Sequence, residues 1–286
     1  MLKERILSAA ILLFIFLASF LSKDPIYFLV IVFIVSVILL YELGKILKLR
    51  NLTLMIYWIL SLAPIIFLYL LIFLNINYFD YIDNQFKTFP INFSILISWI
   101  SLFFWVVLVP IDIKYKKVSS NLRFQLFYGY FLVMPMAIVT SIVFTQNKIL
   151  ILIPFIMIWV ADIGAFFIGK KFGRNKLAKI ISPGKTIEGV IGGFICNIIC
   201  AYILAYFFAV SFYTMLFFAV VITGLSIYGD IYQSFLKRQA NVKDSGSIIP
   251  GHGGLFDRLD SFCPTLPIFF LALIYLNTDI SLKLIP

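Results

Sequence analysis

Nine long apolar segments, separated by short polar stretches, constrain this chain of 286 residues more than any other feature. A helix that crosses a bilayer needs about 20 mostly apolar residues. The segments are continuous and do not alternate between apolar and polar residues, so a membrane β-barrel is not expected. The sequence therefore predicts an all-α polytopic integral membrane protein of about nine transmembrane helices, at about 6–21, 25–41, 53–74, 91–111, 126–145, 149–168, 189–208, 211–228 and 264–278.

The composition excludes most other classes of protein. Hydrophobic residues make up 63% of the chain and charged residues 13%, whereas a soluble domain is about half apolar and a quarter charged. A soluble enzyme, a secreted disulfide scaffold and a disordered chain are therefore not expected. We divide the chain into N-terminal transmembrane helices over 1–150 and a C-terminal transmembrane region over 151–286, whose loops hold the polar motifs.

The basic residues favour one orientation in the membrane. With the N-terminus in the cytoplasm and nine alternating spans, 19 of the 23 Lys and Arg residues fall on the cytoplasmic side. Such an excess is typical of cytoplasmic loops. We therefore attribute the net charge of +10 to the basic residues of the cytoplasmic loops, and no nucleic-acid partner is expected. We predict a multi-pass protein of the inner (cytoplasmic) membrane, with its two largest polar loops, about 169–188 and 229–263, in the cytoplasm.

Cysteines and glycines inside the apolar segments are predicted to pack helices. Cys196 and Cys200 share one helix face, and the three cysteines of the chain form no disulfide framework. Gly189 and Gly193 have the GxxxG spacing of close helix contacts.

Six of the 13 acidic residues lie between positions 162 and 260, among Lys and Arg side chains. Charges of both signs beside a bilayer are costly unless they serve a function, although a set of interfacial ion pairs is the simpler alternative. Mg²⁺ is commonly held by one or two carboxylates plus substrate phosphates, and Lys and Arg also bind phosphate. Glycines let the backbone approach a ligand closely, and the densest stretch contains four of them: Gly246, Gly251, Gly253 and Gly254.

A second polar segment runs from Asp162 to Gly189. Within it, Gly184-Lys185-Thr186 looks like the end of a phosphate-binding P-loop. It is not one, because Lys179 stands where that motif requires glycine, and no strand is expected before it. A basic turn of this kind can still bind phosphate. A zinc site is not expected, because His252 is the only histidine of the chain and no cysteine lies beside it.

The run from Ser234 to Asp260 resembles the signature of the phosphatidate cytidylyltransferases, or CDP-diacylglycerol synthases. The upstream segments 162–174 and 182–189 are also similar to that family, except that Phe166 stands where the family usually has Tyr. The resemblance is specific over about 162–260. The positions that match the signature are Ser234, Lys237, Arg238, Lys243, Asp244, His252, Gly253, Gly254, Asp257, Arg258 and Asp260.

The resemblance implies a reaction in which CTP and phosphatidate give CDP-diacylglycerol and pyrophosphate, with Mg²⁺ as cofactor. It also implies a homodimer, Asp230 and Asp257 as metal ligands, and a monovalent cation such as K⁺ beside Mg²⁺. The predicted catalytic residues are Asp230, Lys237, Arg238, His252, Asp257 and Asp260. The predicted substrate-binding residues are Asp162, Ser182, Lys185, Thr186, Lys243, Asp244 and Arg258.

Other functions remain open at this stage. A related CTP-dependent enzyme could act on another lipid, as a polyprenol kinase or as a cytidylyltransferase for isoprenoid ether lipids. A transporter could use the intramembrane Asp162, but it would be expected to show internal repeats and charges at mid-bilayer depth, which the sequence lacks.

Overall fold

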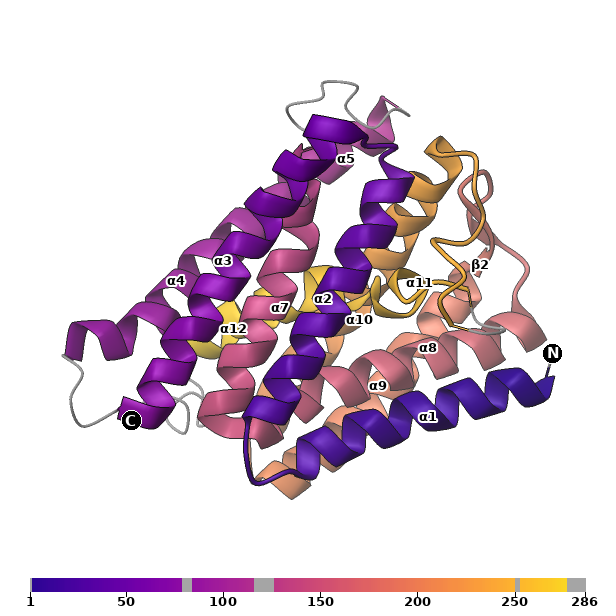
Figure 1. Ribbon diagram of the computed structural model, residues 1–286. Helices are drawn as coiled ribbons and strands as arrows, with labels where there is room; N and C mark the ends of the chain where they lie inside the picture. Colours follow the sequence, from indigo (N-terminus) through magenta and orange to yellow (C-terminus); the bar gives the residue numbers. More distant parts are fainter. Residues whose placement is uncertain (1, 79–83, 116–125, 250–252, 277–286) are drawn as a thin grey trace.

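Long helices make up almost all of the computed structural model, which describes residues 2–78, 84–115, 126–249 and 253–276 (Figure 1). Continuous apolar runs favour helices because a helix satisfies its own backbone polar groups, which lipid cannot do. The N-terminal helices are α1 (Leu2–Leu21), α2 (Ile26–Ile46), α3 (Asn51–Tyr78), α4 (Asn84–Phe103), the π-helix η2 (Phe104–Leu108), α5 (Val109–Lys114) and α7 (Tyr128–Asn147).

The remaining elements begin at a short 3₁₀ helix, η3 (Lys148–Ile151), where the chain changes direction (Figure 1). Helices α7 and α8 are therefore two helices at an angle, although their apolar residues are nearly continuous. The elements after η3 are α8 (Leu152–Phe172), β1 (Lys176–Ala178), β2 (Ser182–Thr186), α9 (Ile187–Phe208), α10 (Phe212–Gln239), α11 (Phe256–Leu259) and α12 (Phe262–Tyr275).

Each of the nine predicted apolar segments coincides with a helix of the structure. Within the described ranges, seven stretches are long and apolar enough to cross a membrane. One of them, Tyr128–Phe172, contains both α7 and α8, and the apolar part of α1, Ala10–Leu21, is shorter than the others. The all-α polytopic architecture is confirmed. The count of nine spans and the cytoplasmic N-terminus stay predictions.

Helices α8 and α9 pack closely through small residues. A Cβ added to Gly189 would lie 2.8 Å from the Ala165 carbonyl oxygen, and one added to Gly193 would lie 3.0 Å from that of Ala161. The predicted packing role of these two glycines is confirmed. Helix α1 lies against α8 on the other side, where the Phe16 and Phe155 rings stack at 5.4 Å.

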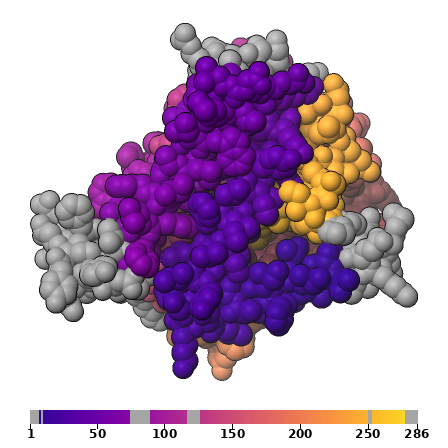
Figure 2. Space-filling model, viewed as in Figure 1, coloured from indigo at the N-terminus to yellow at the C-terminus, as the bar shows by residue number. Residues whose placement is uncertain are grey.

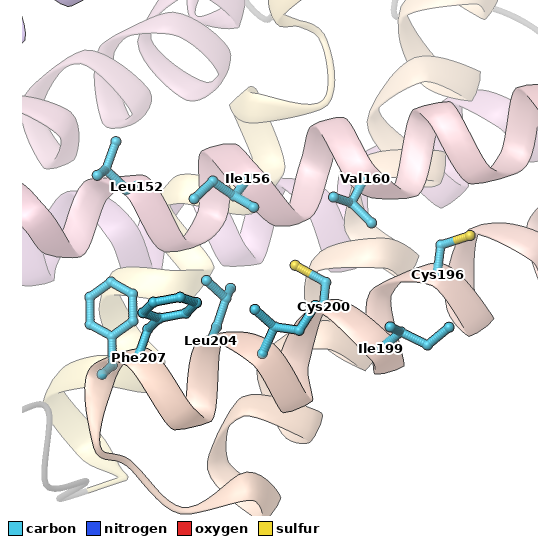
Figure 3. Close-up of a pocket in the computed structure, with 10 residues that line it drawn as sticks. Leu152, Ile156, Val160, Cys196, Ile199, Cys200, Leu204 and Phe207 are labelled. Carbon is cyan, nitrogen blue, oxygen red and sulfur yellow. The ribbon is translucent and has the colours of Figure 1, made fainter.

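An apolar groove of about 570 Å³ lies between α8 and the C-terminal part of α9 (Figure 3). Both Cys196 and Cys200 line it, and Cys200 points from α9 toward α8. Neither thiol forms a disulfide, and Cys196 also fills the space beside Gly164. The structure therefore confirms that these cysteines pack helices.

A two-stranded antiparallel hairpin, β1–β2, connects α8 to α9. The expectation that no strand precedes Gly184 was wrong. Strands of three and five residues leave too little pattern to detect, and Glu188 stabilises the hairpin by accepting hydrogen bonds from the backbone N–H groups of Arg174 and Asn175. The hairpin matters for function because β2 carries Ser182, Lys185 and Thr186.

Candidate active site

One face of α10 organises the candidate site. Asp230, Gln233 and Lys237 follow at positions i, i+3 and i+7, so they lie along one side of the helix. Asp257, at the start of α11, reaches this side. Its Oδ1 accepts hydrogen bonds from Lys237 Nζ at 2.7 Å and from Gln233 Nε2 at 3.0 Å. Asp230 and Asp257 are thus brought to the same part of the molecule, as the sequence analysis required.

The other oxygen of Asp257 holds the loop that connects α10 to α11. Its Oδ2 accepts hydrogen bonds from the backbone N–H groups of Ser245, at 2.9 Å, and Gly254, at 3.2 Å. The loop closes on itself through a bridge between Ile249 and Gly253. Gly253 has φ of +84°, a backbone conformation that favours glycine. Both oxygens of the Asp257 carboxylate are therefore engaged within the protein.

A second ion pair connects the hairpin to α10. Lys185 Nζ lies 2.6 Å from Asp230 Oδ2, and Ser234 donates a hydrogen bond to Asp230 Oδ1 at 3.3 Å. This contact brings the second polar segment of the sequence to the main motif. The two segments, far apart in the sequence, therefore lie side by side in the structure.

Two further carboxylates surround this second pair. Asp260 lies where α10 and α12 pack tightly: a Cβ added to Gly229 would lie 2.7 Å from the Asp260 carbonyl oxygen. Asp162 on α8 accepts a hydrogen bond from Ser226 at 3.3 Å. Asp162, Asp230, Asp260 and Lys185 lie close enough to interact electrostatically.

Asp257 and Asp260 do not act as one pair, although they are three residues apart. Asp257 faces Lys237 and the loop, whereas Asp260 Oδ1 accepts a hydrogen bond from the Ser261 backbone N–H at 2.6 Å.

Other predicted residues lie at the edge of this site or outside the described part of the chain. Thr186 caps α9, since its hydroxyl oxygen accepts a hydrogen bond from the Gly189 N–H at 3.1 Å, and it is buried. Ser182 is half-buried on β2. His252 lies outside the described residues. Four charged residues are exposed around the loop: Arg238, Lys243, Asp244 and Arg258.

Comparison with known proteins identifies the family. The sequence profile of the Cytidylyltransferase family matches residues 3–276. The chain belongs to this family.

Individual relatives agree with this assignment. A Haemophilus influenzae protein named phosphatidate cytidylyltransferase is 31% identical over 294 residues, which cover 94% of this chain and 97% of that protein. A Pseudomonas aeruginosa protein of the same name is 50% identical over 123 residues, or 42% of this chain and 45% of that protein. A third protein of that name, from Staphylococcus aureus, is 38% identical over 173 residues, 57% of this chain and 66% of that protein.

The donor set of this family member fits a hard cation around Asp230. Asp162, Asp230 and Asp260 are three carboxylates near one lysine, and oxygen ligands are those that Mg²⁺ prefers. No group of three or more His, Cys, Asp or Glu side chains in the described ranges could hold a metal ion by itself. Such a site needs further ligands from substrate phosphates. Asp257 could join it only if its contact with Lys237 were exchanged.

Two residues that contact Asp257 or the loop between α10 and α11, which we call the motif loop, were not predicted. Gln233 donates to Asp257, and Glu42 on α2 accepts hydrogen bonds from Ser245, Leu255 and Phe256. Glu42 did carry a signal in the sequence, because it directly follows the apolar segment 25–41, and a charged residue at the edge of a bilayer is costly unless it serves a function. The N-terminal region over 1–150 therefore contributes a side chain to the site.

Proposed function

We propose that this cytidylyltransferase family member transfers the cytidylyl group of CTP to phosphatidate, giving CDP-diacylglycerol and pyrophosphate for phospholipid biosynthesis. A relative that carries the name of that activity matches 94% of this chain. The single observation that supports a shared site is the contact of Lys185 with Asp230, because it brings cationic and acidic groups from two separate segments together.

The reaction itself makes modest demands on the protein. A phosphate oxygen of phosphatidate attacks the α-phosphorus of CTP, a new P–O bond forms, and the bond to the bridging oxygen breaks as pyrophosphate leaves. The attacking oxygen is already anionic at neutral pH, so little general-base help is needed. The main barrier is repulsion between two anionic substrates, and positioned cationic groups offset such charge.

Lysines are well placed to supply this charge. Lys185 on β2 and Lys237 on α10 each contact a carboxylate of the site. When phosphates enter, these ammonium groups can bind them as charge-assisted hydrogen-bond donors. Arg238, Lys243 and Arg258 extend the basic surface around the loop.

Mg²⁺ is proposed as the cofactor, held by Asp230 together with Asp260 or Asp162, with Asp257 as the further predicted ligand. When bound, Mg²⁺ would neutralise charge on the CTP phosphates. The carboxylates around Asp230 supply acceptor oxygens on the side where Lys185 lies. A K⁺ ion beside Mg²⁺ stays a prediction from the family resemblance.

The membrane setting follows from the same reasoning. CTP is cytosolic and phosphatidate lies in the membrane, so the site must face the cytoplasm. Nine spans with the N-terminus in the cytoplasm put the site loops on that side. We propose this topology, in the inner membrane of a bacterial cell. A homodimer is also proposed. Labelling of single cysteines from either side of the membrane tests the topology, and the mass of the protein in nanodiscs tests the dimer.

The direct test uses the purified protein with CTP, phosphatidate and Mg²⁺, with CDP-lipid and pyrophosphate measured separately. Equal amounts of both products support the proposal. The matched arms replace phosphatidate with a polyprenol or with an isoprenoid ether-lipid phosphate. Release of CDP with polyprenyl phosphate would instead identify a kinase, and activity confined to the ether lipid would identify the other alternative.

A further inference from the structure

A buried carboxylate in the N-terminal region contacts the loop that connects α10 to α11. Glu42 lies on α2 and is 1% exposed. A buried charge is costly unless hydrogen bonds compensate it. Figure 2 shows the segment after α10, in orange, at the surface directly beside the N-terminal helices, in indigo and purple.

Three donors from the loop meet the two oxygens of Glu42. Ser245 Oγ donates to Oε2 at 2.7 Å, and the Phe256 backbone N–H donates to the same oxygen at 2.8 Å. The Leu255 N–H donates to Oε1 at 3.0 Å. These donors are more than 200 residues from Glu42 in the sequence, so the contact is a purely tertiary one.

Ser245 connects Glu42 to Asp257. Its hydroxyl donates to Glu42, and its backbone N–H donates to Asp257 Oδ2. Phe256, whose N–H also donates to Glu42, immediately precedes Asp257 in the chain. The two carboxylates therefore share Ser245 as a partner, and displacement of one carboxylate would displace the other.

Two glycines of the motif allow this close approach. A Cβ added to Gly254 would lie 2.5 Å from Glu42 Oε2, and one added to Gly246 would lie 2.6 Å from Oε1. The sequence predicts that these glycines make room for a ligand. In the structure the Glu42 carboxylate lies close to both of them, and the Ser245 hydroxyl lies closer still to Gly254.

We propose that Glu42 is a positioning residue for cytidylyl transfer: it holds Ser245, Leu255 and Phe256 in place and thereby keeps Asp257 in contact with Lys237. The inference rests on the proposed function for its kinetic consequence. The holding of the loop is a structural claim, and it can be tested without substrate.

The first test is Glu42→Gln. Glutamine has the same shape but one acceptor oxygen, so at least one backbone N–H of the loop must face an amide N–H. We expect kcat to fall about tenfold to a hundredfold with little change in KM, since a lost hydrogen bond to a charged group has about this effect. Hydrogen exchange of the Leu255 and Phe256 amides should become faster.

Asp112→Asn is the matched control. Asp112 is also a buried carboxylate of the N-terminal region, and it accepts hydrogen bonds from the hydroxyls of Tyr128 and Tyr232 rather than from the loop. This variant should leave exchange of the loop amides unchanged. If it accelerated their exchange as much as Glu42→Gln does, the effect would be a general loss of stability and the proposal would be wrong.

A second variant keeps the proposal testable if Glu42→Gln does not fold. Ser245→Ala removes one donor and leaves Glu42 with its two backbone partners. We expect a smaller loss of kcat, and less than additive effects in the double variant, since both changes remove one contact.

Loop exchange and kcat that stay within about twofold of the parent in Glu42→Gln would overturn the assignment. If the parent protein made no CDP-lipid, the proposed function would fail. The exchange experiment would still decide whether Glu42 holds the loop.

Discussion

Two lysine–aspartate pairs lie along α10 and differ sharply in their surroundings. Lys185 and Asp230 are 2.6 Å apart, with side chains 22% and 36% exposed. Lys237 and Asp257 are 2.7 Å apart, with side chains 12% and 10% exposed. Asp257 also accepts hydrogen bonds from Gln233, Ser245 and Gly254, whereas the described partners of Asp230 are Lys185 and Ser234.

The difference separates two tasks in one site. An exposed ion pair contributes little to stability, so its partners can be exchanged for phosphate or a cation at small cost. A buried pair with full hydrogen bonding is costly to break from one side, because the remaining charge is left without compensation. We interpret the Lys185–Asp230 pair as one that only meets the substrates. The Lys237–Asp257 pair has both tasks: it meets the substrates and it also sets the shape of the loop.

Asp257→Asn should have the largest effect, because it acts on both tasks. We expect turnover to be lost and the protein to be destabilised by about 3 kcal/mol or more, since Lys237 is left buried without its counter-charge. Transfer from labelled CTP measures the first effect, and thermal unfolding in detergent measures the second. Near-normal transfer by Asp257→Asn would refute the metal role of Asp257. Unchanged stability would refute the claim that the Lys237–Asp257 ion pair stabilises the protein.

Asp230→Asn should sharpen the contrast. We expect turnover to be lost here too, because Asp230 is the carboxylate best placed for Mg²⁺. The free energy of unfolding should change by less than about 1 kcal/mol, since the half-buried pair with Lys185 is better screened by solvent than the Lys237–Asp257 pair. The same two measurements apply, with Asp257→Asn as the comparison. Equal destabilisation by the two variants would contradict the distinction between the pairs.

The sequence predicted the parts of this molecule that depend on long or dense local patterns. The apolar segments became helices because each is long enough to satisfy its own backbone in lipid. The gathering of charges at Asp162, Lys185, Asp230 and Asp257 was also found, since charged residues are scarce in the chain. The difference in exposure between the open pair, Lys185–Asp230, and the enclosed pair, Lys237–Asp257, was not predicted. It depends on how α10, the hairpin and the loop pack together.

What the sequence could not predict depends on single residues in tertiary contact. Glu42 directly follows an apolar segment, and its partners lie more than 200 residues away. Thr186 was predicted to bind substrate, but its hydroxyl caps α9, a role that depends on where that helix begins. The hairpin was missed because its strands are too short to show a period.

Arg258→Ala should have the smallest effect and tests how far the open side of the site extends. Arg258 follows Asp257 on α11 but is exposed, whereas Asp257 is paired with Lys237. If Arg258 binds substrate phosphate, its loss should raise the KM of CTP or phosphatidate about tenfold, as expected for one charge-assisted hydrogen bond, with stability unchanged. Arg50→Ala is the matched control, because Arg50 is exposed just before α3 and its described hydrogen bonds are with Thr53 and Leu54 of that helix. If Arg258→Ala left both KM values and kcat unchanged, as Arg50→Ala should, substrate contact would end at Lys185 on β2 and Lys237 on α10.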